Sequence, residues 1–318
     1  MARASFPLLL PAGRPYDVVG LGGNAFDHLL TIPRHPQPGE KIRFTAYESQ
    51  GGGRAATAMV VVTRLGHSAR YLGGVGDDAE GERVLEDLRA EGVDVAGVRV
   101  RPGGLTQRAF IMVDEVSGER TIVWGRGEGM PLGVEEVDER IVTSGRLFFT
   151  DAQNPLAAIP AARIAAHAGM PVISDLEAIR PGLDALLPMV DFAIAGPGFP
   201  ELATGSRDLS VSLRAIEERS GGALVIVTQG GGGAVARIDG RLERLPAYAV
   251  EAVDTTGAGD VFHGAFAVAC LRGFELRDAI DFANAIAAMK CRRPGGRAGI
   301  PRSLEEVERF RNSTPHRT

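Results

Sequence analysis

Residues 254–260 read DTTGAGD and place an aspartate after a run of small residues, where an apolar helix is predicted to begin. The first amides of a helix lack partners within the helix and carry the positive end of its dipole, so small residues there let an anion approach. Asp260 could simply cap the helix. It could also be a general base that takes a proton from a hydroxyl, while the amides of Gly257, Ala258 and Gly259 stabilise charge on a transferred phosphoryl group.

Another glycine-rich segment, residues 20–25, follows a predicted strand and imitates the dinucleotide-binding fingerprint. That fingerprint requires a helix next, with an acidic residue about 20 positions later. Pro33, Pro36 and Pro38 exclude such a helix. No glycine stretch is followed by Lys-Ser/Thr at the Walker A spacing. The sequence therefore argues against both a Rossmann site and a P-loop.

The bulk composition is that of an ordinary globular chain of 318 residues with a net charge of −5. A negative chain is a poor partner for nucleic acid or an anionic membrane, and no apolar run approaches the length of a membrane span. The two cysteines, Cys270 and Cys291, are too few for a disulfide framework and favour a reduced, cytoplasmic protein. Prolines interrupt the apolar patch of residues 1–15, which we expect to be a disordered tail and not a signal peptide.

The elements that must position Asp260 follow an α/β pattern. From residue 145 onward, apolar strands alternate with helices, which predicts a mostly parallel sheet with helices on both faces. Two β-rich stretches, about 27–50 and 98–127, have no helices of their own. We expect them to form a small β-sheet lid beside a single α/β domain that spans residues 16–318.

Several segments together resemble one family. DTTGAGDVFHGA is similar to the C-terminal signature of the ribokinase-like (PfkB-type) carbohydrate kinases, and GGGRAATAMVVVTRLG with YLGGVGDD resembles their N-terminal signature. The resemblance covers roughly residues 16–303, and the combination of these two signatures with the segment KCRRPGGRAGIP is similar in particular to the sulfofructose kinase branch. It implies a ribokinase-like fold and a phosphotransferase that moves the γ-phosphoryl group of ATP to a primary hydroxyl of a ketose-like sugar.

The resemblance also implies roles for individual residues. Asp260 would be the base, and Gly257, Ala258 and Gly259 the anion hole. The sugar would be bound by Asp27, Gly52, Gly53, Arg54 and Thr57. ATP would lie along Thr228, Gly230 and Gly233 of the segment VTQGGGG, with Asn284 near the adenine. Mg²⁺ would accompany ATP, and a K⁺ ion would be held through carbonyls by Asp254, Thr256 and Gly295.

Two departures from the family pattern leave alternatives open. The Asn-x-x-Glu motif that organises magnesium in the family is replaced by AGPGFPE, with Gly196 or a neighbour in place of the asparagine and Glu201 as the nearest acid. Either Glu201 substitutes with a shifted geometry, as a weak candidate for a magnesium-bound water, or magnesium is held mainly by ATP and water. Thr57 stands where the family usually has asparagine. These changes motivate a catalytically silent sugar- or nucleotide-binding protein as an alternative.

A nucleoside kinase of the same fold is the other alternative. It would need an aromatic base pocket, for which Trp124 is the main candidate. The sequence leaves open which sugar is used and whether it carries a sulfonate or phosphate. An exposed edge of the lid sheet would allow a homodimer through the lid.

Overall fold

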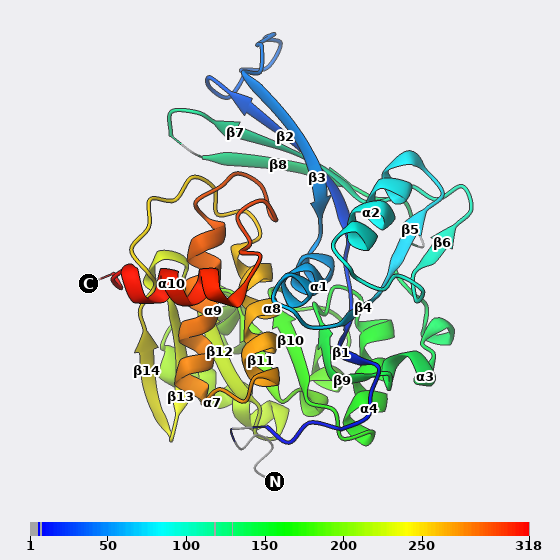
Figure 1. Cartoon of the computed structure of the whole chain (residues 1–318), viewed down its shortest axis with the longest axis vertical. Helices are drawn as coiled ribbons and strands as arrows, with labels where there is room; N and C mark the ends of the chain where they lie inside the picture. The colour runs from blue at the N-terminus through cyan, green and yellow to red at the C-terminus, as the bar shows by residue number, and fades with distance from the viewer. Residues whose placement is uncertain (1–5, 7, 118, 129, 318) are drawn as a thin grey trace.

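An eight-stranded sheet forms the centre of the molecule in the computed structural model, which describes residues 6, 8–117, 119–128 and 130–317 (Figure 1). The strands run in the order β14-β13-β12-β11-β10-β9-β1-β4. Their bounds are β1 Tyr16–Leu21, β4 Ala69–Leu72, β9 Gly145–Thr150, β10 Val172–Leu176, β11 Phe192–Ala195, β12 Leu224–Thr228, β13 Ala234–Ile238 and β14 Arg241–Leu245. Strands β4, β1, β9, β10, β11 and β12 run parallel to one another. Strand β13 is antiparallel to β12, and β14 is antiparallel to β13.

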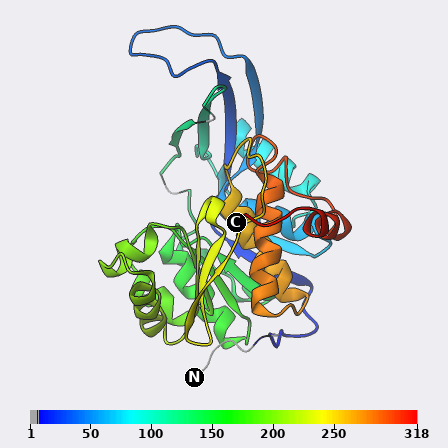
Figure 2. The ribbon, with the colours of Figure 1, turned by 90° about the vertical axis from the view of Figure 1, so that its left-hand side faces the viewer.

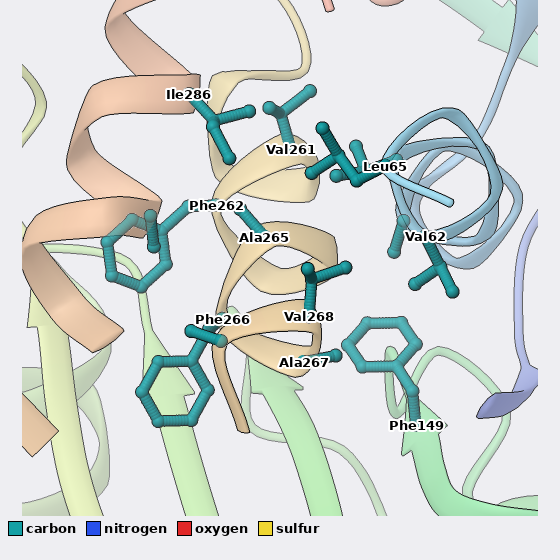
Figure 3. Packing of buried hydrophobic residues seen from close by; sticks show 14 of the residues in the cluster. Val62, Leu65, Phe149, Val261, Phe262, Ala265, Phe266, Ala267, Val268 and Ile286 are labelled. Atoms are coloured by element: carbon teal, nitrogen blue, oxygen red, sulfur yellow. The ribbon is translucent and has the colours of Figure 1, made fainter. Parts of the chain in front are cut away.

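Helices cover both faces of this sheet, as the sequence predicts. One face carries α1 Arg54–Arg64, α8 Ala258–Leu271, α9 Leu276–Lys290 and α10 Leu304–Ser313, and Figure 3 shows how α8 packs against its neighbours. The other face carries α3 Glu139–Val142, α4 Pro155–His167, α5 Leu183–Leu186, α6 Phe199–Thr204 and α7 Leu209–Ser220. Strands buried on both faces need continuous apolar sequence, which explains entirely buried strands such as β10 and β11.

A second sheet of four strands projects from one end of the main body (Figure 2). Its order is β3-β2-β7-β8, with bounds β2 Ala25–Ile32, β3 Ala46–Gly52, β7 Arg108–Asp114 and β8 Arg120–Gly125. These four strands fall in the stretches predicted to form the lid. Strand β6 Arg99–Arg101 also falls in a predicted lid stretch but is not part of the lid sheet. It pairs with β5 Gly74–Gly76 in a separate two-stranded sheet, next to α2 Ala79–Ala90.

The register of the four-stranded sheet decides which lid residues face the body. Asp27 pairs with Ala109, and Ala109 pairs with Trp124, so all three side chains lie on one face of the sheet. Arg120 lies on the same face and donates to the Thr255 hydroxyl of the main body. The face that carries Asp27 is therefore the one turned toward the N-terminus of α8.

The remaining segments are short. The 3₁₀ turns are η1 Val134–Glu136, η2 Leu187–Met189 and η3 Gly230–Gly232. Within the segment 1–15 that was expected to be disordered, residues 1–5 and 7 lie outside the described residues, and Phe6 packs edge-on against Phe192 and Phe266. Among the residues that the structure describes, no helix is both long and apolar enough to cross a membrane.

Candidate active site

The N-terminus of α8 has backbone amides available for an anion. Gly257 precedes the helix with a φ of 71°, a left-handed conformation that favours glycine. The Ala258 amide donates to the Thr255 carbonyl, whereas the amides of Gly259 and Asp260 have no acceptor among the described residues. The first turn of this buried helix can therefore bind a negative group.

Asp260 lies in that turn with an altered acidity. Its pKa is raised to about 6, first because the carboxylate is buried and then because the Asp175 carboxylate lies nearby. The positive charge of Arg54 opposes this rise. A carboxylate with a pKa close to neutrality is a better general base than an ordinary aspartate, because it is still ionised at pH 7 yet binds a proton more strongly.

A polar cluster lies behind Asp260, and of its members only Arg54 was predicted as a site residue, for sugar binding. Arg54, at the start of α1, forms ion pairs with Glu177 and, at 3.7 Å, with Asp175. The Nε2 atom of His263 is 3.6 Å from the Asp175 Oδ1 atom, and burial lowers the pKa of His263, so the ring is neutral at pH 7. The candidate ligand atoms of Asp175, Asp260 and His263 lie within 4.8 Å of one another, close enough to hold a metal ion.

Asp27 is the candidate sugar ligand on the lid side. Burial raises its pKa to about 6, the Arg297 guanidinium opposes that rise, and the negative charge of Asp260 adds to it. A Cβ atom on Gly52 would lie 2.1 Å from the Asp27 Oδ2 atom, so only glycine lets that carboxylate rest on the backbone. Gly53 has a φ of 86° and forms the N-cap of α1. Gly52 and Gly53 therefore bring the backbone close to Asp27.

Thr57 differs from its predicted role as a direct sugar ligand. The residue is 1 % exposed, and its hydroxyl accepts a hydrogen bond from the Arg297 Nε atom at 3.1 Å. Arg297 also donates to the Gly52 carbonyl at 2.9 Å and pairs with Asp87. Thr57 thus helps to hold a buried arginine beneath the glycine turn.

Two further polar residues near this turn were missed from sequence. The Asp151 carboxylate, at the end of β9, accepts from the Gly23 amide at 2.6 Å and from the Ala55 amide at 3.4 Å. The Asn24 side chain donates to the Tyr71 hydroxyl and the Gly74 carbonyl, and its buried Oδ1 atom has no partner among the described residues. A polar residue directly after a buried parallel strand was the available signal for Asp151.

A pocket on the other side of α8 collects the predicted nucleotide residues. Its lining includes Thr228, Gly230, Gly233, Ala258, Gly259 and Asn284. The Asn284 amide donates to the carbonyls of Leu245 and Pro246. Because Ala258 and Gly259 line this pocket, a triphosphate bound there can reach the N-terminus of α8.

Glu201 does not fit its predicted magnesium role. Its side chain is 52 % exposed and forms an ion pair with Arg207 at 2.9 Å. Glu201 is also absent from the lining of the nucleotide pocket. The cluster of Asp175, Asp260 and His263 is therefore a better candidate for a divalent ion than Glu201.

Hydrogen bonds within the protein already engage Asp254, one of the residues predicted to hold a K⁺ ion. The Asp254 carboxylate accepts from the amides of Thr256 and Gly295, each at 2.7 Å. The Asp254 carbonyl accepts from the Lys290 ammonium, also at 2.7 Å. Of the predicted ligand residues, Thr256 keeps a buried hydroxyl without a partner among the described residues. Lys290 was not identified from the sequence.

Residues 23–303 match the model of the pfkB family of carbohydrate kinases. The chain is 28 % identical to a ribokinase of Haemophilus influenzae over 296 residues, which cover 91 % of this chain and 96 % of the relative. It is 30 % identical to an ATP-dependent ribose-1-phosphate kinase of Halopiger xanaduensis over 285 residues, or 88 % of this chain and 94 % of the relative.

Solved structures agree with these relatives. A ribokinase of Arabidopsis thaliana complexed with ribose and ATP is 25 % identical, with a TM-score of 0.80 over 93 % of this chain and 98 % of the other. A structure from E. coli in complex with ATP and Mg²⁺ is 26 % identical, with a TM-score of 0.81 over 93 % and 99 %. The chain belongs to the PfkB family of carbohydrate kinases, with their ribokinase-like fold, and is a phosphotransferase with an alcohol group as acceptor.

Proposed function

We propose that this protein transfers the γ-phosphoryl group of ATP to a hydroxyl of a sugar, with Asp260 as the general base. The observation that carries the proposal is the position of Asp260 between two half-sites. Its neighbours Ala258 and Gly259 line the nucleotide pocket, while its charge adds to the rise in the pKa of Asp27 that burial causes on the lid side. A group so placed can meet both a triphosphate and a sugar hydroxyl.

The chemistry follows from this placement. Asp260 takes the proton as the sugar oxygen bonds to the γ-phosphorus and the bond to the β-phosphate oxygen breaks, which releases ADP. The free amides of Gly259 and Asp260 and the Arg54 guanidinium stabilise the negative charge of the transferred group. A magnesium ion bound with ATP would neutralise phosphate charge, and Asp175 and His263 are the side chains near Asp260 that could help to hold it.

The lid completes the site by excluding water. Arg120 on β8 contacts Thr255, which lines the nucleotide pocket, so the lid sheet bridges the two half-sites. Water exclusion favours transfer to the sugar over hydrolysis of ATP.

The rate should depend on pH through two carboxylates. Asp260 and Asp27 both have a pKa raised to about 6, so each gains a proton as the pH falls through that value. We expect kcat/KM to be constant above pH 7.5 and to fall below pH 6 with a slope between one and two decades per pH unit. Initial rates from pH 5 to pH 8.5 test this, and the Asp27→Asn variant should show a slope of one. A profile that stays level to pH 5 would contradict a base with this acidity.

A panel of acceptors tests the class of substrate. Trp124 is 61 % exposed on the same lid face as Asp27, where an aromatic ring can stack on a sugar or on a nucleobase. Arg126 lines a cavity together with Asn24 and has no ion-pair partner among the described residues, so it could bind a phosphate or sulfonate. ADP release should be measured with aldopentoses, ketohexoses, their phosphate esters, sugars that carry a sulfonate group, and nucleosides.

Each result of this panel has a meaning. We expect a sugar or sugar derivative to give the highest kcat/KM. A preference for nucleosides would instead identify a nucleoside kinase. If ATP binds but no acceptor stimulates turnover, the protein is a silent binder and the proposal fails.

We also propose a homodimer formed by the lid. The face of the lid sheet turned away from the body exposes Tyr47, Phe110 and Val123, and His28 stacks between two of these rings. Exposed apolar residues on a sheet with free edges favour association. Analytical ultracentrifugation should give a dimer for the native chain and a monomer for Phe110→Glu. Leu156→Glu, at an exposed apolar site on α4, is the control and should remain dimeric.

A further inference from the structure

Lys290, the last residue of α9, is an unusual buried charge. Its side chain is completely inaccessible, with a relative exposure of 0 %, and its ammonium donates to the Asp254 carbonyl at 2.7 Å. Lys41 and Lys290 are the only lysines of the chain. A lysine ammonium is a compact charge on a flexible stem, so it can reach a single buried carbonyl in this way.

The ammonium lies at the joint between the loop that precedes α8 and the loop that follows α9. The amides of Val253 and Asp254 both donate to the Cys291 carbonyl, which ties residues 253–254 to the end of α9. The Asp254 carboxylate holds the amides of Thr256 and Gly295. Lys290 thus fixes the carbonyl of the residue that organises both loops, three positions before the glycine at the start of α8.

The residues of this joint do not fit a bound K⁺ ion. The resemblance to ribokinase-like proteins predicts that carbonyls of Asp254, Thr256 and Gly295 hold such an ion. The Asp254 carbonyl is already occupied by a positive group, and its carboxylate by two amides. A second cation on the same carbonyl would be repelled by the ammonium at short range and in a buried environment.

We propose that the Lys290 ammonium takes the place of the monovalent cation next to the anion site, so that turnover needs no K⁺. The ammonium carries the same single positive charge and is covalently attached to a packed helix, so it is present at every salt composition. Its contact with the Asp254 carbonyl holds residues 254–257 in the conformation that leaves the first amides of α8 free. Lys290 is a positioning residue, and its role rests on the proposed use of that helix terminus for phosphoryl transfer.

The native chain gives the first test. Initial rates should be measured with Mg-ATP and the best acceptor in a choline or tetramethylammonium buffer without Na⁺, K⁺ or NH₄⁺. We expect the same kcat and the same KM for ATP when 100 mM choline chloride is replaced by 100 mM KCl. A rate that rises several-fold with K⁺, and less with Li⁺ of equal ionic strength, would overturn the inference while leaving the proposed kinase activity intact.

Variants give the second test. Lys290→Ala should lose at least tenfold in kcat/KM for ATP in choline buffer, and K⁺, NH₄⁺ or methylammonium should restore part of that loss. Lys290→Met, which fills the space without a charge, should lose activity without rescue. Lys41→Met, the other lysine, should behave like the native chain.

Thermal unfolding of each variant separates folding from positioning. If Lys290→Ala folds and its loss is insensitive to every monovalent cation, the ammonium does not act as a cation substitute and the inference is wrong. If both Lys290 variants fail to fold, the cation dependence of the native chain alone decides. If the native chain has no kinase activity with any acceptor, the proposed function has failed, and this is distinct from either result.

Discussion

Replacing Asp260 by asparagine should lower kcat by about 10³-fold, the middle of the range for removal of a general base. The amide keeps the size and the position of the side chain at the start of α8 but cannot take the hydroxyl proton. Because burial raises the pKa of Asp260, its charge is unfavourable in the folded state at pH 7. Asp260→Asn should therefore unfold at the same temperature as the native chain or a higher one.

A matched control separates catalysis from helix capping. Asp278 also lies in the first turn of a helix, α9, and is exposed to solvent. Asp278→Asn should lose only the interaction with the helix dipole, about 0.5 kcal/mol of stability, and none of the turnover. Steady-state kinetics and the Kd for ATP by calorimetry test both variants. An Asp260→Asn enzyme that keeps more than a tenth of the native kcat would show that Asp260 is a cap and not a base.

Replacing Asp27 by alanine should raise the KM for the sugar about 100-fold and leave the Kd for ATP unchanged. The reason is that a buried carboxylate on the lid face can accept two hydroxyl hydrogen bonds, each worth about 1.5 kcal/mol because the acceptor is charged. Glu48→Ala on the neighbouring strand β3 is the control, since Glu48 is exposed on the same sheet. Steady-state kinetics with varied sugar and with varied ATP provide the measurement.

The stability of the Asp27 variants gives a second readout with a defined sign. The folded-state pKa of about 6 lies above the ordinary aspartate value, so the folded protein binds more protons than the unfolded chain between pH 4 and pH 6. Stability contributed by this group therefore decreases as the pH rises through that window. Asp27→Asn should be at least as stable as the native chain at pH 7.5. A large loss of stability would assign Asp27 to the fold, and a change confined to the KM for ATP would assign it to the nucleotide site; either result would contradict a role in sugar binding.

Local sequence was sufficient for the start of α8 and for the overall α/β class. Small residues before an apolar run predict a helix terminus whose amides are accessible, and the structure places Gly257 and Asp260 there. The alternation of strands and helices after residue 145 also predicts the parallel sheet, because both signals depend on neighbours along the chain. The lid was predicted for the same reason, apart from β6, whose partner β5 could not be known from an isolated three-residue strand.

The roles of Thr57 and Glu201 could not be predicted from sequence alone. The Thr57 hydroxyl accepts a hydrogen bond from Arg297, which is 240 positions away along the chain. Glu201 forms an ion pair with Arg207 at the surface. A motif position predicts which residue type can reach a ligand, but a competing partner decides whether that side chain is free to do so. Such partners become visible only when distant segments are packed together.

The sequence by itself determined that a carboxylate and a set of unpaired amides occur at one helix terminus, since those features are local to residues 254–260. Only the tertiary structure decided what surrounds them. It brought Asp175 of β10 next to the carboxylate and to His263 of the same helix, and it set the Lys290 ammonium against the Asp254 carbonyl of the preceding loop. Buried charges need partners to offset the loss of hydration, and those partners come from separate strands and helices that meet at one edge of the sheet.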